Sequence, residues 1–266
     1  MIAALRFFVV FWLVSWSNGT FPNIESWNEI MQHHVSPGQL DGISLHVVDY
    51  EAMRNDSRLE AFLTILSSTN TSSFDRNETY AFFMNAYNAL AINMIIQHPC
   101  TGLGSPIKSI LDIGSLNHSV WKMNAGIING KEFSLDDVED YLRNPQPFKE
   151  DPRLHACIVC ASISCPNVRT EAYVPERVHS QMSNQMRDFL SNTKKGMRLD
   201  KETNTLTLSP IFLWFIEDFY RAAGSVENFI FPYISSTDAA FIKENSPKKS
   251  YFKYNWNVNG KPPCNC

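Results

Sequence analysis

The sequence has no apolar run after residue 20 that is long enough to cross a bilayer, which takes roughly 20 apolar residues. It also has little positive charge: 23 Lys and Arg residues stand against 27 Asp and Glu residues, and they form no basic run or stripe. A chain that binds nucleic acid needs such a stripe to neutralise phosphates. We therefore expect neither a nucleic-acid partner nor stable insertion in a membrane.

Internal repeats, low-complexity linkers and a regular alternation of strands with helices are also missing. Their absence argues against repeat architectures and doubly wound parallel sheets. Hydrophobic residues make up 44% of the chain, which is enough for a packed core. We predict an α+β fold: a predominantly helical single domain with short antiparallel strands or hairpins and a buried central helix.

The central helix is predicted from residues 77–99, NETYAFFMNAYNALAINMIIQHP, which are apolar on nearly every side and end at Pro99. A helix that is apolar all round is a buried helix. Asn85 and Asn88, three positions apart, lie on one face of it. Buried amides need hydrogen-bond partners, so these two either tie neighbouring backbone together or line a polar pocket.

Shorter elements follow this helix. Asn129-Gly130 is a strong hairpin signal, and Ser134 is a suitable residue to begin the next helix. Residues 155–162, HACIVCAS, have the composition of a short β-strand. Residues 210–224, PIFLWFIEDFYRAAG, are predicted to form one helix, with proline at its start and glycine at its end.

The N-terminus has the features of a secretory signal peptide over residues 1–19. A single Arg6 precedes an apolar run over residues 7–16, and Ser17 and Gly19 place small side chains before the cleavage point. A signal anchor that stays attached is the alternative. We predict a cleaved signal and a protein that is secreted or resides in the lumen of the secretory pathway.

Glycosylation sequons agree with that route. Tripeptides with the acceptor pattern for N-linked glycans, and no proline in the middle, begin at Asn55, Asn70, Asn77 and Asn117. One such tripeptide occurs often by chance, but several crowded between residues 55 and 79 indicate an exposed, glycan-bearing front portion. We expect N-linked glycans at all of these asparagines.

The 6 cysteines form an even number, which in a secreted chain is consistent with a set of disulfides. Cys264 and Cys266 would tie down the C-terminal tail, with Cys100 or a cysteine within residues 151–166 as partner. Structural zinc usually takes separated ligand pairs on turns, and the sequence does not have this pattern. We expect no metal and no cofactor.

The stretch DPRLHACIVCASISCP, residues 151–166, brings one histidine and several cysteines together. A nucleophilic cysteine needs a lowered pKa, which a nearby histidine or other cation supplies. Cys165 follows the β-type run, in a loop that can fold back toward His155. A disulfide between Cys160 and Cys165 is the alternative, and it would itself shape the loop.

Taken together, these stretches resemble the DUF547 domain family, which is named for having no established function. The resemblance covers residues 75–222 and rests on FFMNAYNAL, SLDDVEDYLR, DPRLHACIVCASISCP, EAYVPERVHSQMSNQMRDFL and LTLSPIFLWFIEDF. It implies a mixed α and β fold and an association with redox chemistry, because related chains fuse the domain to a glutaredoxin. The signature positions of the family correspond to Asn85, Tyr87, Asn88, Glu139, His155, Cys160, Ser162, Cys165 and Pro166.

The resemblance also sets the domain boundaries. Residues 20–74 are expected to form an N-terminal helical extension, and residues 223–266 a tail that packs on the domain and is stapled by its cysteines. One position departs from the family: the segment VEDYLR commonly reads Glu-His there, and Asp140 stands where that histidine would be. If the histidine transfers protons in the family, this chain is altered or inactive.

Two hypotheses follow. In the first, the chain is a secreted enzyme that acts on a small-molecule or peptide substrate, with Cys165 or Cys160 as nucleophile and His155 as base or thiol activator. Glu139 would orient His155, and the side chains that would bind substrate are Asn85, Tyr87, Asn88 and Ser162. In the second, it is a disulfide-stapled extracellular binding or structural glycoprotein without catalysis, in which all the cysteines are paired.

Overall fold

The computed structural model describes residues 21–115, 118–144 and 150–263. The predicted signal peptide at residues 1–19, the sequon at Asn117 and the terminal Cys264 and Cys266 lie outside these ranges. Within them, no helix combines the length and the apolar character that crossing a membrane requires.

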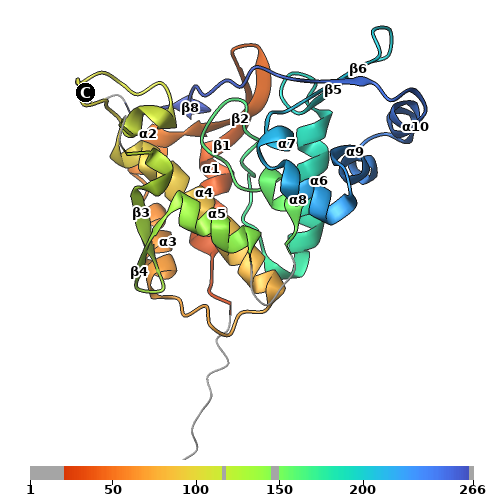
Figure 1. Ribbon diagram of the computed structural model, residues 1–266. Coiled ribbons are helices and arrows are strands. Elements are labelled where there is room, and N and C mark those ends of the chain that lie inside the picture. Colours follow the sequence, from red (N-terminus) through yellow and green to blue (C-terminus); the bar gives the residue numbers. More distant parts are fainter. Residues whose placement is uncertain (1–20, 116–117, 145–149, 264–266) are drawn as a thin grey trace, which may run out of the picture.

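Helix α4 (Arg76–Gln97) runs through the centre of the molecule (Figure 1). A capping box begins it: the Asp75 side chain accepts from the Glu78 amide at 2.9 Å, and the Glu78 side chain accepts from the Asp75 amide at 2.8 Å. Nearly every side chain from Thr79 to Ile96 is buried. The prediction of a buried central helix is confirmed.

Before α4, the chain forms a hairpin and three helices. They are α1 (Glu25–His34), β1 (Val35–Leu40), β2 (Ile43–Asp49), α2 (Tyr50–Arg54) and α3 (Ser57–Ser68). Trp27 of α1 stacks on Phe62 of α3 with ring centroids 5.0 Å apart, and both side chains are fully buried. This apolar contact fixes α1 against α3.

After α4 come the 3₁₀ helices η1 (Ile110–Ile113) and η2 (Val120–Lys122), and then the predicted ribbon and helix: β3 (Asn124–Ile128), β4 (Lys131–Ser134) and α5 (Leu135–Arg143). Asn129 and Gly130 have φ angles of 49° and 70°, as a tight hairpin turn requires. The Ser134 hydroxyl caps α5 by accepting from the Asp137 amide at 3.1 Å. Both sequence signals are confirmed.

The predicted β-type run over residues 155–162 is wrong. The Asp151 side chain accepts from the Arg153 amide, and Pro152 provides the φ angle of a first helical turn, so the chain forms η3 (Pro152–Ala156). Residues 157–165, which we call the cysteine loop, then follow an irregular path. Local capping and proline geometry therefore override the strand propensity of the apolar residues.

The next elements are η4 (Pro175–Arg177), α6 (Val178–Ser191), the hairpin β5 (Met197–Asp200) and β6 (Thr205–Leu208), and two helices, α7 (Ile211–Trp214) and α8 (Ile216–Ala223). The single helix predicted over residues 210–224 is thus interrupted at Phe215. There the ring of Phe215 stacks on His155 with centroids 4.1 Å apart. Gly224 ends α8 with a φ of 76°, as its position predicted.

The C-terminal portion contains α9 (Val226–Ile230), η5 (Phe231–Tyr233), α10 (Ser236–Asn245), β7 (Lys248–Tyr251) and β8 (Gly260–Lys261). Strand β7 pairs with β6 and β8 pairs with β2, both in parallel. These parallel pairs were not predicted. Figure 1 shows the segment, in blue, crossing the top of the molecule from α10 to β8, so it links the two sides.

Apolar side chains form a large core around α4 and a second cluster between α6, the β5–β6 hairpin and α8. The strands belong to small sheets of two or three members. The fold of the described residues is therefore α+β and mostly helical, as predicted.

Candidate functional site

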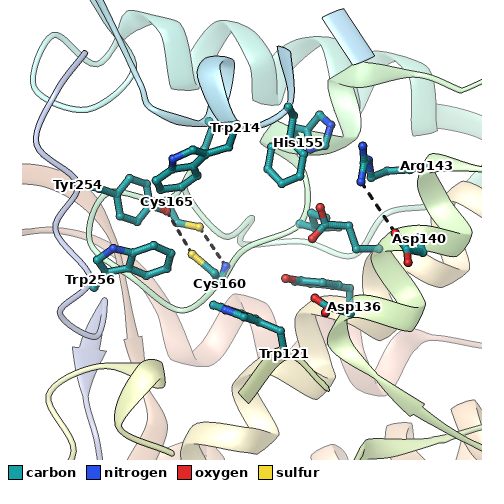
Figure 2. A pocket seen from close by; sticks show the side chains of 15 residues that line it. Trp121, Asp136, Asp140, Arg143, His155, Cys160, Cys165, Trp214, Tyr254 and Trp256 are labelled. Carbon is teal, nitrogen blue, oxygen red and sulfur yellow. Dashed lines mark hydrogen bonds and ion pairs between the residues drawn. The ribbon is translucent and has the colours of Figure 1, made fainter. Parts of the chain in front are cut away.

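A cavity of about 480 Å³ opens between α4, α5, the cysteine loop, α7 and the C-terminal segment. Figure 2 shows Trp214, Tyr254 and Trp256 on the side that holds the two cysteines, and Asp136 and Asp140 on the opposite side. The lining consists of aromatic, acidic and thiol side chains with a few aliphatic ones: Tyr87, Trp121, Asp136, Glu139, Asp140, Arg143, His155, Ile158, Cys160, Cys165, Ile211, Trp214, Phe215, Tyr254 and Trp256.

Helix α5 supplies the charged wall of the cavity. It is strongly amphipathic: Leu135, Val138 and Leu142 are buried in the core around α4. Its polar side chains at i, i+3, i+4 and i+7 share the other face, and all of them line the cavity: Asp136, Glu139, Asp140 and Arg143. The position of α5 therefore follows from its apolar face and leaves its charged face toward the cavity.

Glu139 has an unusual environment. Burial raises the pKa of its carboxyl to about 7, although the Arg143 guanidinium acts in the opposite direction. Burial also raises the pKa of Asp136. No hydrogen bond or ion pair holds either carboxyl among the residues that the structure describes. Two carboxyl groups thus face the cavity without a fixed partner.

His155 is held by Asp218 of α8, and not by Glu139 as we expected. The His155 Nε2 lies 2.8 Å from Asp218 Oδ2. Arg143 Nε and Nη2 donate to the same carboxylate at 2.7 and 2.9 Å, and Arg221 Nη2 donates at 2.5 Å. Asp218 is completely buried, so these partners compensate its desolvation.

The protonation of this pair follows from its surroundings. Burial lowers the pKa of His155, and the hydrogen bond with Asp218 offsets this only in part. Burial acts to raise the pKa of Asp218, but His155 and Arg143 outweigh it and lower that pKa. His155 is therefore a neutral imidazole that donates from Nε2 to a carboxylate, which leaves Nδ1 as an acceptor.

The cysteine loop brings Cys165 back to Cys160. Ala161 adopts a left-handed φ of 56°, an uncommon conformation for a residue with a Cβ. This turn places the Cys165 sulfur 3.0 Å from the Cys160 backbone nitrogen, which donates to it. The Cys160 sulfur in turn lies 3.2 Å from the Tyr254 hydroxyl and 3.1 Å from the Ser162 hydroxyl.

The three cysteines of this stretch differ in acidity. Burial acts to raise the pKa of Cys165, but hydrogen bonds from Cys160 and Tyr254 outweigh it and lower the pKa to about 7. Burial raises the pKa of Cys157 to about 12 and that of Cys160 well above its usual value. Cys165 is therefore the most acidic thiol of this stretch.

Two anchors hold the cysteine loop. The buried Lys195 Nζ donates to the Cys165 carbonyl oxygen at 2.7 Å and to Asn167 Oδ1 at 2.8 Å. Burial lowers the pKa of Lys195 to about 8. On the other side, the C-terminal segment hydrogen-bonds to the loop backbone, with Ile163 donating to the Asn257 carbonyl at 2.8 Å. The same segment presents Tyr254 and Trp256 to the cavity.

The structure places most of the predicted site residues at the cavity. Those that line it are Tyr87, Glu139, His155, Cys160 and Cys165. Ser162 is buried behind them and contacts Cys160 and Tyr254. Asp140 also lines the cavity.

Asn85 and Asn88 are not part of the described lining. The Asn85 side chain exchanges two hydrogen bonds with the Tyr173 backbone, at 2.8 and 2.9 Å. The Asn88 side chain donates to the Cys157 carbonyl and accepts from the Val159 amide, both at 2.9 Å. Their amides tie backbone together, which is the first of the two alternatives considered for them.

Cys157, Cys160 and Cys165 are free thiols. This contradicts both the Cys160–Cys165 disulfide and the arrangement in which all the cysteines are paired. The predicted pairing of the terminal cysteines with Cys100 involves residues outside the described ranges and stays a prediction.

Sequence reasoning missed Asp218, Tyr254 and the indoles that line the cavity. Asp218 belongs to LWFIEDFYRAAG, where a single acidic residue on the apolar face of an amphipathic helix was the available signal. Tyr254 and Trp256 lie in an aromatic, turn-rich tail that has no periodicity to place them. Only the long-range pairing of that tail brings them to the cysteines.

Comparison with known proteins identifies the region around this cavity. Among curated proteins and among solved structures, no match was found. Residues 71–190 match the family described as protein of unknown function, DUF547. That range includes α4, α5 and the cysteine loop, whereas α7, α8 and the C-terminal segment that complete the cavity lie beyond it. Residues 71–190 of this chain are therefore similar to the DUF547 domain family.

Proposed function

We propose that this protein is a thiol-dependent hydrolase in which Cys165 is the nucleophile. The observation that carries the proposal is the position of the Cys165 sulfur, which lines the cavity and accepts a hydrogen bond from the Cys160 backbone nitrogen at 3.0 Å. The pKa of Cys165 is lowered to about 7, while those of Cys157 and Cys160 are raised, and Cys165 faces the cavity. A thiolate is the nucleophilic form of cysteine, and a lowered pKa makes it available near neutral pH.

The chemistry needs a substrate with an electrophilic carbonyl carbon. The Cys165 thiolate attacks that carbon, an S–C bond forms, and the bond to the leaving group breaks as the leaving group takes a proton from water. A second water then attacks the thioester, and His155 Nδ1 accepts its proton and passes it to solvent. The acid leaves, and the Cys165 thiolate is restored.

Asp218 has a positioning role in this scheme. Its carboxylate fixes the proton of His155 on Nε2 by a 2.8 Å hydrogen bond. This tautomer makes Nδ1 the basic nitrogen. Phe215, stacked on the imidazole at 4.1 Å, fixes the plane of the ring.

An acyl probe tests the scheme. We expect p-nitrophenyl acetate to acetylate Cys165, with an initial burst of nitrophenolate that is absent in Cys165→Ala and kept in Cys157→Ala. His155→Ala should keep the burst and slow the later turnover, because the thioester loses its base. Peptide mass spectrometry locates the acetyl group. Absence of acetyl on Cys165, or equal acetylation of Cys157, would overturn the proposal.

We further propose that the chain enters the secretory pathway and carries N-linked glycans. The basis is the signal-like sequence at residues 1–19 together with the exposed positions of Asn55 and Asn70. Asn77 is different: it lies in the first turn of α4, and Thr79 of its sequon is buried. We expect glycans on Asn55 and Asn70 and little on Asn77. Glycopeptide mapping of protein from a eukaryotic culture medium checks this, and unmodified asparagines at both exposed sites would contradict it.

A further inference from the structure

The charges of the cavity do not balance. Asp136, Glu139 and Asp140 face it from α5, whereas the guanidinium of Arg143 binds Asp218 through two hydrogen bonds at 2.7 and 2.9 Å. Asp218 in turn is completely buried and also holds His155. The positive charge of Arg143 is therefore already matched, and the cavity has an excess of negative charge.

Other cations do not correct this excess. Arg221 binds Glu150 at 2.8 Å and Asp218 at 2.5 Å. Lys122 acts on Asp136 only through space and forms no ion pair with it among the described residues. A buried or half-buried carboxylate without a partner costs free energy, so a group that supplied positive charge here would be stabilised.

The opposite side of the cavity is an array of aromatic rings. Trp256 lies 4.5 Å from Tyr254, 5.7 Å from Trp214 and 6.2 Å from Trp121, measured between ring centroids. Trp214 is 48% exposed, which is unusual for an indole that has such neighbours. Indole faces offer a large, flat apolar surface against which the body of an organic ligand can pack.

His155 adds a second kind of acceptor. The residue is 3% exposed and lines the cavity, and its Nε2 is used by Asp218. No described residue donates to its Nδ1. An acceptor with no donor among the described residues can accept a hydrogen bond from a ligand that brings N–H groups.

We propose that the cavity binds an organic cation, an ammonium group attached to an apolar body, with the ammonium at Asp136 and Glu139 and the apolar body against the indoles of Trp121, Trp214 and Trp256. If the protein is the proposed hydrolase, it follows that its substrates carry an amine; this consequence rests on the proposed function. The binding itself does not require a reactive Cys165.

Alternative ligands fit less well. An anion would meet the α5 carboxylates, and a neutral apolar ligand would desolvate them without compensation. A metal ion would need several acidic or imidazole ligands at one point. Within the described ranges, no group of three or more His, Cys, Asp or Glu side chains is arranged to hold one.

The test uses full-length protein with Cys165→Ala, so that no covalent reaction interferes, and follows tryptophan fluorescence at pH 8. The probes are matched in shape: phenethylamine, phenethyl alcohol and 3-phenylpropanoate. We expect the amine to bind about tenfold or more tighter than the alcohol, and the carboxylate not to bind measurably. Equal affinity for amine and alcohol would overturn the inference.

Two matched variants locate the binding. Glu139→Gln, in the same background, should weaken amine binding by about tenfold, because it removes a charge-assisted hydrogen bond. Glu132→Gln, an exposed position on β4, is the control and should bind as before. If both variants, or neither, lose affinity, or if Mg²⁺ displaces the amine, the assigned site is wrong.

The two proposals fail separately. Loss of the amine preference with normal acetylation of Cys165 would remove the substrate class and leave the hydrolase. Amine binding without acetylation of Cys165 in the unmodified chain would leave a cation-binding protein and remove the thiol chemistry.

Discussion

Helices α4 and α5 both carry polar side chains toward the middle of the molecule. Those of α4 are hydrogen-bonded to backbone, whereas two carboxyls of α5 have no fixed partner. On α4, the amides of Asn85 and Asn88 each make two hydrogen bonds to backbone at 2.8–2.9 Å and are almost completely buried. On α5, the carboxyls of Asp136 and Glu139 line a cavity and have no fixed partner.

The difference separates polar groups that build the fold from those that are available to a ligand. A buried amide with all its partners lowers the energy of one arrangement of the chain and specifies it. A half-buried carboxyl without a partner lowers the stability of the protein and is retained where binding uses it.

Asp218 shares features of both groups. Its carboxylate has hydrogen-bond partners, as the amides of α4 have, but one of those partners is His155, which lines the cavity. Asp218→Ala leaves Arg143 and His155 without their shared partner, so we expect the free energy of unfolding to fall by about 3–5 kcal/mol. Urea denaturation measures this loss. The exposed neighbour Glu217→Ala is the control, and a loss of equal size there would contradict the assigned role.

Asn88→Ala removes the two hydrogen bonds that fix the cysteine loop to α4. We expect a loss of about 2 kcal/mol, because the Cys157 carbonyl and the Val159 amide become unsatisfied. Asn93→Ala, on the same helix but partly exposed, should change stability by less than about 0.5 kcal/mol. If Asn88→Ala were instead neutral in urea denaturation but abolished amine binding, the division between the two helices would not hold.

Glu139→Gln should change how stability depends on pH. The folded pKa of about 7 exceeds the ordinary value of 4.5, so the folded state holds the proton more tightly and stability falls as pH rises between these values. The groups that face this carboxyl are Asp136, Asp140 and Arg143 of α5, Asp218 of α8 and Tyr87 of α4.

The glutamine variant has no such proton. Relative to the unmodified protein, it should therefore gain about 2–3 kcal/mol between pH 5 and pH 8. Thermal denaturation at both pH values checks the sign. A relative loss of stability over the same range would show that Glu139 is held as a carboxylate by partners within the protein.

Asp140→Asn should have the smallest effect. Its side chain is 73% exposed, and its ion pair with Arg143 is long at 3.9 Å. Exposed pairs of this kind contribute less than about 1 kcal/mol, so we expect a change within about 0.5 kcal/mol in urea denaturation. A larger change that disappears in high salt would mean that Asp140, like Asp218, is needed to balance Arg143.

The sequence predicted the elements whose signals are local. The apolar surface of α4, the Asn129-Gly130 turn, the cap at Ser134 and the glycine that ends α8 are each encoded within a few positions. It failed where a local preference was overridden. Residues 155–162 have strand-like composition, yet Asp151 and Pro152 start a helical turn there, and the helix over residues 210–224 breaks where Phe215 turns onto His155.

For the site residues, too, local signals were predictable and contacts between distant residues were not. His155, Cys165 and Glu139 were predicted to share one site, and all of them line the cavity. The residue that holds His155 could not be predicted, because Asp218 is separated from it by 63 positions and no periodicity links them. Glu139 is closer to His155 in the sequence than Asp218 is, but in the folded protein it is the Asp218 carboxylate of α8 that lies against the imidazole.

The attachment of the C-terminal segment to the cysteine loop links the acidity of Cys165 to a contact between distant parts of the chain. Cys160 and Tyr254 are 94 positions apart, and bringing such distant segments together costs loop-closure entropy that a helix or a hairpin does not. The Tyr254 hydroxyl is one of the groups that lower the pKa of Cys165. Until this segment docks, Cys165 therefore lacks the contribution of Tyr254 to its lowered pKa.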